Sequence, residues 1–257
     1  MPNTNRPAML VTGSAKRLGA AIARAFGAAG WHVVIHYRRS ADAAERLAGQ
    51  LPSAETIRCD LADGESAVAM IEGLAEKLPD WGALVNCASL FEEDSVTGLD
   101  PATNRRAMQV NATSPARMAQ AYLATARSEA GRCVIHVTDQ KLANPNPDFF
   151  SYTMSKHALD STIAMLSMGA ADEADRVYGL APGAILPSHD QSEAETEVSH
   201  RLNLLRRKTD ASEVASAALF LAGGHLASGQ TLYIDSGQHL LAQSRDVIYL
   251  AREGEAG

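Results

Sequence analysis

Apolar runs of strand length alternate with amphipathic helical patterns along residues 8–236. Such alternation is typical of a parallel sheet covered by helices, and several of the runs are almost wholly apolar, as strands buried on both faces are. The predicted strands are residues 8–12, 32–37, 55–59, 83–88, 133–138, 176–181 and 231–235. The predicted helices are residues 18–29, 41–50, 64–78, 102–129, 151–171 and 212–222.

Seven strands joined by six crossovers predict the fold class α/β. We expect one Rossmann-like domain over residues 1–257, a doubly wound parallel seven-stranded sheet with helices on both faces. The irregular stretch 184–207, rich in Glu and Ser, is predicted to be a substrate lid. Residues 242–257 form a C-terminal tail.

Composition excludes several classes of protein. Lys and Arg total 23 against 30 Asp and Glu, so a net charge of −7 argues against nucleic acid and anionic membranes as partners. Three widely spaced cysteines fit neither a disulfide framework nor a zinc site, so we predict no metal and a reducing cytoplasm. The first ten residues lack the apolar core of a signal peptide. The charge-free run 214–234 contains glycines and polar residues that indicate helix, turn and strand, not a membrane span.

The segment TGSAKRLG, residues 12–19, follows the first predicted strand and opens the first predicted helix. A turn of this kind directs backbone N–H groups and the helix dipole at a pyrophosphate. Two glycines alone are weak evidence, because glycine is common in strand-to-helix turns. The position in the fold strengthens the prediction, and the expected cofactor contacts are Thr12, Gly13, Arg17, Leu18 and Gly19.

The end of the second predicted strand indicates which dinucleotide binds. It reads HYRRS, with no carboxylate before Asp42, where an acidic residue would accept the ribose hydroxyls of NAD. Cationic and hydroxyl donors suit the 2′-phosphate instead, so NADPH is the predicted cofactor. A solvated basic turn is the alternative. The predicted contacts are His36, Tyr37, Arg38, Arg39 and Ser40.

Further cofactor contacts are expected where other strands end. Asp60 follows the third strand and either accepts a hydrogen bond from the adenine amino group or caps the next helix. The remaining predicted contacts at such positions are Leu61, Asn86, Ala88, Pro182 and Gly183.

Tyr152 and Lys156 are four residues apart and therefore share one face of a predicted helix. A phenol titrates near pH ~10, and a cation one turn away stabilises its anion. The pair is therefore a candidate acid–base site that also contacts the cofactor. The same spacing occurs on many helices by chance, so its place after the fifth strand of a phosphate-loop fold is what supports the assignment.

With the TGSAKRLG loop and the Tyr-x-x-x-Lys pair, the chain resembles the short-chain dehydrogenases/reductases from about residue 8 to about residue 241. The resemblance implies that Asn111 supports a proton-relay water and that the protein is a homotetramer. Two positions depart from the family pattern. Arg17 stands where the middle glycine of the loop usually lies, and Asp139, thirteen residues before Tyr152, stands near the place of the usual carbonyl-binding serine.

Asp139 disfavours simple ketone reduction. An ionised carboxylate is a poor partner for a ketone oxygen, on which negative charge grows during hydride transfer. A carboxyl group suits a nitrogen heterocycle, because it accepts from ring N–H groups and delivers a proton to a C=N nitrogen. The predicted catalytic residues are Asp139, Tyr152, Lys156 and Asn111. The predicted substrate contacts are Arg17, Ser89, Phe91, Asp139 and Tyr152, with Phe91 stacking on a flat ring.

Together, TGSAKRLG, HYRRS, NCASLF, the Asp139/Tyr152/Lys156 set and the tail IDSGQHL are similar to the pteridine reductases, above all to the bacterial dihydromonapterin reductases. This resemblance implies NADPH-dependent reduction of 7,8-dihydropterins to tetrahydropterins, with dihydromonapterin, dihydrobiopterin or dihydrofolate as substrate. Each feature taken alone has a structural explanation, such as a helix cap for Asp139 or a core position for Phe91.

Two other functions remain open at this stage. One is an NADPH-dependent carbonyl or acyl-carrier reductase of the same superfamily, against which Asp139 argues. The other is an NADPH-binding sensor without catalysis, against which the intact Asn111, Tyr152 and Lys156 argue.

Three further features carry weaker expectations. Cys87 lies beside the predicted cleft without a base partner and is expected to be a buried small residue. His189 lies in the predicted lid, where it either contacts substrate or is solvated. Residues 247–250 are apolar for a free terminus, and we expect them to pack on another subunit.

Overall fold

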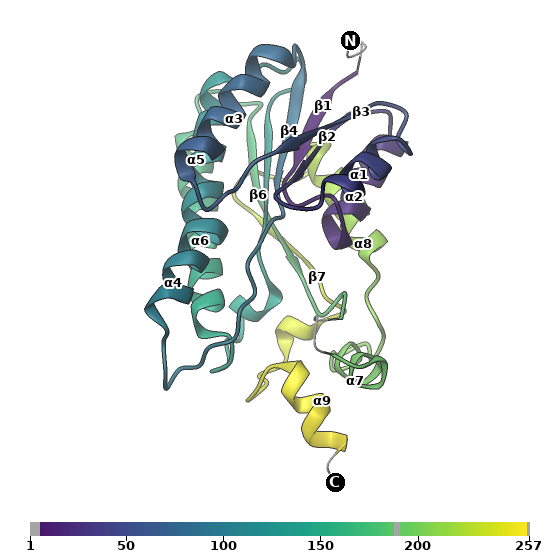
Figure 1. Cartoon of the computed structure of the whole chain (residues 1–257), viewed down its shortest axis with the longest axis vertical. Coiled ribbons are helices and arrows are strands. Elements are labelled where there is room, and N and C mark those ends of the chain that lie inside the picture. Colours follow the sequence, from purple (N-terminus) through teal and green to yellow (C-terminus); the bar gives the residue numbers. More distant parts are fainter. Residues whose placement is uncertain (1–5, 188–190, 256–257) are drawn as a thin grey trace.

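The computed structural model describes residues 6–187 and 191–255. Its centre is one sheet of seven parallel strands in the order β3-β2-β1-β4-β5-β6-β7 (Figure 1). The strands are β1 (Ala8–Val11), β2 (His32–Tyr37), β3 (Ala54–Arg58), β4 (Trp81–Asn86), β5 (Cys133–Val137), β6 (Arg176–Pro182) and β7 (Thr231–Ile234). The predicted α/β fold is confirmed.

Helices cover both faces of the sheet, with α3, α5 and α6 on one side and α1, α2 and α8 on the other (Figure 1). The helices are α1 (Arg17–Ala28), α2 (Ala41–Ala48), α3 (Gly64–Lys77), α4 (Pro101–Met108), α5 (Ser114–Thr125), α6 (Phe150–Gly169), α7 (Glu193–Ser199), α8 (Ala211–Ala222) and α9 (Val247–Glu255). α1 packs on α8, α3 on α5 and α4 on α6. No helix within the described residues is both long and apolar enough to span a membrane.

The apolar runs of the sequence become the central strands because both of their faces are covered. Every residue of β1 and of β4 is buried. Leu10 pairs with Val34 on one side and with Leu84 on the other, so β1 lies between β2 and β4. The strand order reverses direction there, and in such sheets ligands bind beyond the carboxyl ends of the strands at that point.

The stretch predicted as one helix over residues 102–129 is two helices joined by the π-helical turn Gln109–Thr113. Asn111, at the centre of this turn, is fully buried and forms side-chain hydrogen bonds to Leu90 and Ser155. A hydrophobic period cannot reveal such a turn, because one inserted residue barely changes the apolar pattern.

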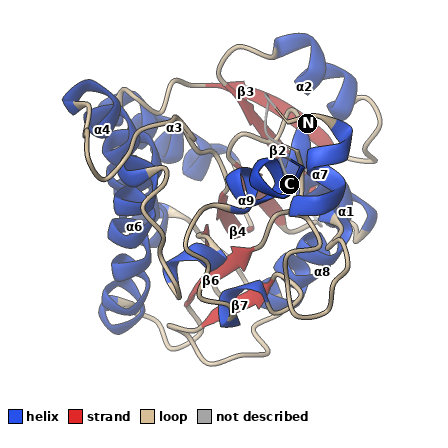
Figure 2. Cartoon of the chain, turned by 90° about the horizontal axis from the view of Figure 1, so that it is seen from below, coloured by secondary structure: helices blue, strands red, loops and turns tan. Residues whose placement is uncertain are grey.

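Two helices were not predicted. The lid stretch contains α7, which begins at a capping box made by Ser192 and Glu195. The tail contains α9, which packs on α7 (Figure 2). Both helices lie beyond the carboxyl ends of the strands (Figure 1).

Candidate active site

A cavity of about 550 Å³ lies at the carboxyl ends of the strands. Most of the predicted site residues line it: Gly13, Arg17, Leu18, Gly19, His36, Arg38, Asp60, Leu61, Ala88, Ser89, Phe91, Asp139, Tyr152, Lys156, Pro182 and Gly183. The predicted residues outside this lining are Thr12, Tyr37, Arg39, Ser40, Asn86 and Asn111. His189 lies outside the described residues.

The loop between β1 and α1 requires its two glycines. Gly13 has φ +67°, and a Cβ added there would lie 3.0 Å from the Cα of Ala88. A Cβ on Gly19 would lie 2.7 Å from the carbonyl oxygen of Gly13. The loop is therefore folded tightly on itself. Its N–H groups at Gly13 and Ser14 donate to His36, and the loop brings the N-terminus of α1 to the cavity.

His36 differs from its predicted role as a cationic donor to a phosphate. Its side chain is buried, its Nδ1 accepts from the N–H of Gly13 at 3.0 Å, and its Nε2 donates to the carbonyl of Cys59 at 3.1 Å. Burial lowers the pKa of His36 to about 4. His36 is therefore neutral at pH 7 and braces the glycine loop.

Arg38 is the cation that the HYRRS segment brings to the cavity. Its Nη1 lies 4.0 Å from Oδ1 of Asp60, and both side chains are exposed. The same oxygen of Asp60 accepts from the N–H of Ala62 at 3.0 Å, as expected for a residue that caps a turn. Arg39 is exposed, whereas Tyr37 and Ser40 are half-buried. All three lie outside the cavity lining.

The side chains of Thr12 and Asn86 connect the strands whose ends carry the site. The Oγ1 of Thr12 accepts from the N–H groups of Cys87 and Ala88 at 2.9 and 3.0 Å, which fastens the end of β4 to the end of β1. The Nδ2 of Asn86 lies 3.2 Å from Nδ1 of His136 inside the sheet. We predicted cofactor contacts for these two residues, whereas their side chains hold strands together.

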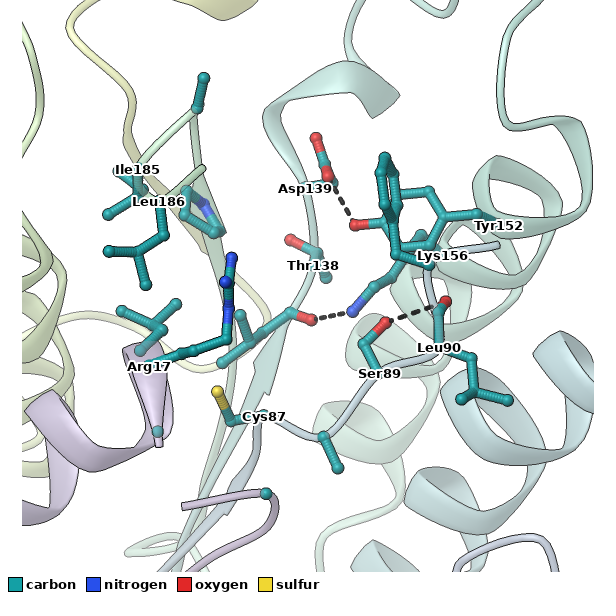
Figure 3. Close-up of a pocket in the computed structure, with 18 of the residues that line it drawn as sticks. Arg17, Cys87, Ser89, Leu90, Thr138, Asp139, Tyr152, Lys156, Ile185 and Leu186 are labelled. Carbon is teal, nitrogen blue, oxygen red and sulfur yellow. Dashed lines mark hydrogen bonds between the residues drawn. The ribbon is translucent and has the colours of Figure 1, made fainter. Parts of the chain in front are cut away.

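The phenol of Tyr152 donates to Oδ2 of Asp139 at 2.6 Å (Figure 3). The other carboxylate oxygen, Oδ1, accepts from the backbone N–H of Lys141 at 2.8 Å. Lys156 donates from Nζ to the carbonyl of Val137 at 2.7 Å, and its Nζ lies 5.8 Å from the centre of the Tyr152 ring. The structure therefore brings the predicted tyrosine, lysine and aspartate to one wall of the cavity.

Burial controls the protonation of these three groups. It raises the pKa of Asp139 above its usual range and, together with the adjacent Asp139, raises the pKa of Tyr152 well above 10. It also lowers the pKa of Lys156. Tyr152 is consequently neutral at pH 7, and Asp139 is the stronger acid of the hydrogen-bonded pair.

Asn111 does not direct its side chain at the reacting groups. Its Nδ2 donates to the carbonyl of Leu90 and to Oγ of Ser155, both at 2.9 Å, and its Oδ1 accepts from the N–H of Leu90 at 2.7 Å. Both amide protons are thus used within the protein. The side chain of Asn111 therefore clamps the segment that follows β4, and its support of a relay water stays a prediction.

Phe91 belongs to an aromatic cluster beside Tyr152. Its ring is stacked on Phe149 with centroids 4.0 Å apart and meets Tyr152 edge to face at 4.7 Å. The exposed Ser89 lies on the same segment, and its Oγ is 3.5 Å from the carbonyl of Leu90. The sequence left open whether Phe91 is a core residue or a substrate contact. In the structure Phe91 packs in the aromatic cluster and also lines the cavity.

Arg17 lies across the mouth of the cavity. Its Nη2 donates to the carbonyl of Pro187 at 2.8 Å. Its backbone has φ +54°, a conformation that suits the glycine usual at this position in the family pattern. The guanidinium therefore links the phosphate loop to the segment after β6. In Figure 3 the side chain of Arg17 lies on the same side of the cavity as Ile185 and Leu186. Tyr152 lies on the opposite side.

Several cavity residues were not predicted to line the site. Some lie in segments that the sequence had singled out, namely the TGSAKRLG loop, the predicted lid 184–207 and the apolar residues 247–250, and the rest lie at positions that no motif marked. The residues not predicted are Lys16, Cys59, Thr138, Gln140, Lys141, Ile185, Leu186, Gln191, Ser199, His200, Gln238, Asp246, Val247 and Ile248. Cys87 also lines the cavity, and burial raises the pKa of its thiol to about 11, so it is an unreactive thiol at pH 7.

Two of the four apolar tail residues pack on their own chain, and packing of the tail on another subunit stays a prediction. Val247 and Ile248 are buried against their own chain, and Ile248 packs with Phe149 and Tyr152. These apolar residues therefore have partners without a second subunit. In the described part of the chain, no group of three or more His, Cys, Asp or Glu side chains forms a candidate metal site.

Comparison with known proteins gives three kinds of match. A family model described as enoyl-(acyl carrier protein) reductase matches residues 13–239. Pteridine reductase 1 of Leishmania tarentolae is 28% identical over 279 residues, covering 91% of this chain and 96% of that protein. The 7alpha-hydroxysteroid dehydrogenase of Escherichia coli K12 is 27% identical over 237 residues, covering 89% and 92%.

Among solved structures, FolM alternative dihydrofolate reductase 1 from Brucella canis, complexed with NADP, superposes with a TM-score of 0.86. It is 31% identical in sequence, and the match covers 93% of this chain and 96% of that chain.

Proposed function

The chain belongs to the short-chain dehydrogenase/reductase family, and we propose that it reduces the C=N bond of a 7,8-dihydropterin with NADPH. Dihydromonapterin, dihydrobiopterin and dihydrofolate are the candidate substrates. The observation that carries the proposal is the 2.6 Å hydrogen bond between Tyr152 and Asp139 inside the cavity. A carboxyl group at this position supplies a proton to nitrogen, which a serine hydroxyl does poorly.

The residues of the cavity fit NADPH. The tight loop at Gly13 and Gly19 brings the N-terminus of α1 to the cavity, where it would hold a pyrophosphate, and Arg38 provides a cation for a 2′-phosphate. Lys156 would hold the ribose of the nicotinamide half, with Tyr152 beside it on the same wall of the cavity. The Brucella canis FolM structure is a complex with NADP, which supports the same cofactor here. When bound, NADPH supplies the hydride.

The proton has a short route through Tyr152. While Asp139 is ionised, the phenol donates to it, and no phenolic proton is free for substrate. Once Asp139 is protonated, its carboxyl group donates to the phenol oxygen, and the phenolic proton is directed into the cavity. The substrate nitrogen then takes the proton of Tyr152 as hydride reaches the adjacent carbon, and Tyr152 recovers a proton from Asp139. The raised pKa of Asp139 favours the protonated state that this relay requires.

The remaining contacts suit a flat, polar ring. Phe91 offers an aromatic surface beside Tyr152, and Arg17 offers a guanidinium to a keto oxygen or ring nitrogen from the opposite wall. Ser89 adds an exposed hydroxyl on the same side as Phe91. Pterin recognition thus uses the positions at which the sequence departs from the general family pattern.

The decisive experiment is steady-state oxidation of NADPH with the three dihydropterin candidates and with a panel of simple ketones. We expect turnover of at least one pterin, and at least tenfold lower catalytic efficiency with NADH, because a phosphate contact to Arg38 contributes on the order of 1.5 to 3 kcal/mol. Asp139→Ser is expected to lower pterin turnover more than tenfold and to leave NADPH affinity unchanged.

A wild-type protein that reduces ketones and no pterin would replace this proposal with a carbonyl reductase. Binding of NADPH without turnover of any substrate would support a sensor instead. Equal pterin turnover by wild type and Asp139→Ser would remove Asp139 from the proton route.

A further inference from the structure

The C-terminal tail folds back onto the reactive end of the cavity. Asp246, Val247 and Ile248 line the same cavity as Asp139 and Tyr152, although Asp246 lies 107 positions after Asp139 in the sequence. Val247 and Ile248 are both buried. The tail is therefore part of the cavity wall and not a free terminus.

One residue joins the tail to the carboxyl group of Asp139. Lys141, in the 3₁₀ turn Gln140–Leu142, is 4% exposed, and its Nζ donates to Oδ2 of Asp246 at 3.1 Å. The same Nζ donates to the carbonyl of Asp148 at 2.7 Å. The backbone N–H of Lys141 donates to Oδ1 of Asp139 at 2.8 Å. The side chain of Lys141 is thus anchored on the tail while its backbone orients Asp139.

Asp246 is itself rigidly held. Its Oδ1 accepts from the N–H of Ile248 at 3.1 Å, in the first turn of α9. Its own N–H donates to Oδ2 of Asp148 at 2.8 Å, and the adjacent Arg245 pairs with the same carboxylate at 2.9 Å. A fixed anion therefore faces a buried cation, and this geometry strongly resists displacement of Lys141.

We propose that Asp246 is a positioning residue for Asp139, acting through Lys141, so that the C-terminal segment completes the proton-delivering pair. The proposal rests on the proposed function only for the role of Asp139 as proton source. Closure of the tail over the cavity then orders the turn that carries Lys141, and Asp139 is held in line with the phenol of Tyr152.

Electrostatics gives this arrangement a measurable signature. The groups that face Asp139 are Tyr152 and Lys156 on α6, Lys141 on the 3₁₀ turn and Asp246 before α9. Cys87, after β4, faces Tyr152 and Lys156. The negative charge of Asp246 contributes to the raised pKa of both Asp139 and Tyr152. Removing that charge takes away the carboxylate that lies 3.1 Å from Nζ of Lys141, and both effects lower the pKa of Asp139.

Asp246→Asn tests the proposal without reference to any substrate. The side-chain carboxyl carbons of aspartate are labelled with ¹³C, Asp139 is assigned by its loss in Asp139→Asn, and its titration is followed by NMR. We expect the midpoint for Asp139 to move to lower pH by about one unit. Glu253→Gln is the matched control, because Glu253 lies on α9, is exposed and pairs only with Arg245 at 3.2 Å among the described contacts. The control is expected to titrate as wild type does.

Turnover gives a second, independent readout. Above the Asp139 midpoint, Asp246→Asn is expected to have about tenfold lower kcat with NADPH affinity within twofold of wild type, because a one-unit shift reduces the protonated fraction about tenfold. Asp246→Glu keeps the charge and is expected to restore part of kcat. An unchanged Asp139 midpoint in Asp246→Asn would overturn the proposal, whether or not the wild type reduces pterins.

A second variant keeps the test valid if Asp246→Asn does not fold. Lys141→Met combined with Asp246→Leu replaces the buried pair by apolar side chains of similar size, which commonly preserves stability. We expect a folded protein with wild-type NADPH affinity and at least threefold lower kcat, roughly the effect of losing one well-placed positioning contact. Wild-type kcat in this double variant would show that the pair serves stability alone and would refute the positioning role.

Discussion

Arg17 combines an unfavourable backbone conformation with a place at the mouth of the cavity. Its φ of +54° lies in the left-handed region, which costs a residue with a side chain roughly 1 kcal/mol. A glycine would adopt this conformation freely. The side chain of Arg17 donates to the carbonyl of Pro187, a contact that a glycine cannot make.

Arg17→Gly is expected to leave the free energy of unfolding unchanged or raise it by about 1 kcal/mol, because it relieves the left-handed backbone. Pterin turnover is expected to fall at least tenfold through loss of the guanidinium. Urea unfolding and steady-state kinetics measure the two effects. Arg206→Gly is the matched control, because Arg206 has φ +50°, is exposed and lies outside the cavity lining. A fall in turnover in both variants, or in neither, would contradict a substrate role for Arg17.

At the scale of elements, the junction of β1 and α1 is the most tightly constrained part of the site. A Cβ on Gly19 would approach the carbonyl oxygen of Gly13 to 2.7 Å and the Cα of Ser14 to 2.8 Å. Both contacts are with backbone, so no side-chain rotation can relieve them. The loop would have to open, and the N-terminus of α1 would move relative to the cavity.

Gly19→Ala is therefore expected to lower NADPH affinity at least tenfold and to destabilise the fold by about 1 to 3 kcal/mol. Fluorescence titration with NADPH and chemical denaturation measure the two effects. Gly73→Ala provides the comparison, because Gly73 lies inside α3 and a Cβ there meets open space. That control is expected to gain about 0.5 to 1 kcal/mol of stability and to bind NADPH normally. Normal NADPH binding by Gly19→Ala would mean that the loop does not hold the cofactor.

At the scale of the whole molecule, two buried neutral histidines make the fold sensitive to acid. Burial lowers the pKa of His36 to about 4 and the pKa of His136 to about 3. In the unfolded chain both rings titrate near 6.5. Below pH 6.5 the unfolded state therefore binds more protons than the folded state, and stability falls until the pH reaches the two folded-state values.

We expect the free energy of unfolding to fall by about 2 kcal/mol between pH 6 and pH 5, with the two histidines contributing nearly equally. Urea denaturation at a series of pH values measures this slope. His225→Gln is a suitable control, because it removes an exposed histidine just after α8. This variant keeps both buried histidines and is expected to lose stability with the same slope as wild type. A stability that is flat from pH 6.5 to pH 5 would show that the buried histidines are protonated in the folded state.

The sequence by itself determined the sheet, its strands and most of the cofactor cleft. Apolar runs buried on both faces identify parallel strands. The glycine loop and the Tyr152/Lys156 spacing are local features of the sequence, so they can be recognised without knowing how the chain packs. Asp139 was identified through the resemblance to the short-chain dehydrogenases/reductases, because it stands near the place of the family's usual serine.

Only the tertiary structure decided how the remaining groups act. The neutral state of His36, the inward clamp of Asn111 and the meeting of Lys141 with Asp246 all depend on which segments fold over the sheet. Burial and long-range contact set protonation and direction, and no local pattern encodes them. The tail contributes to the reactive site because the chain returns across the carboxyl ends of the strands, a path that hydrophobic periodicity does not predict.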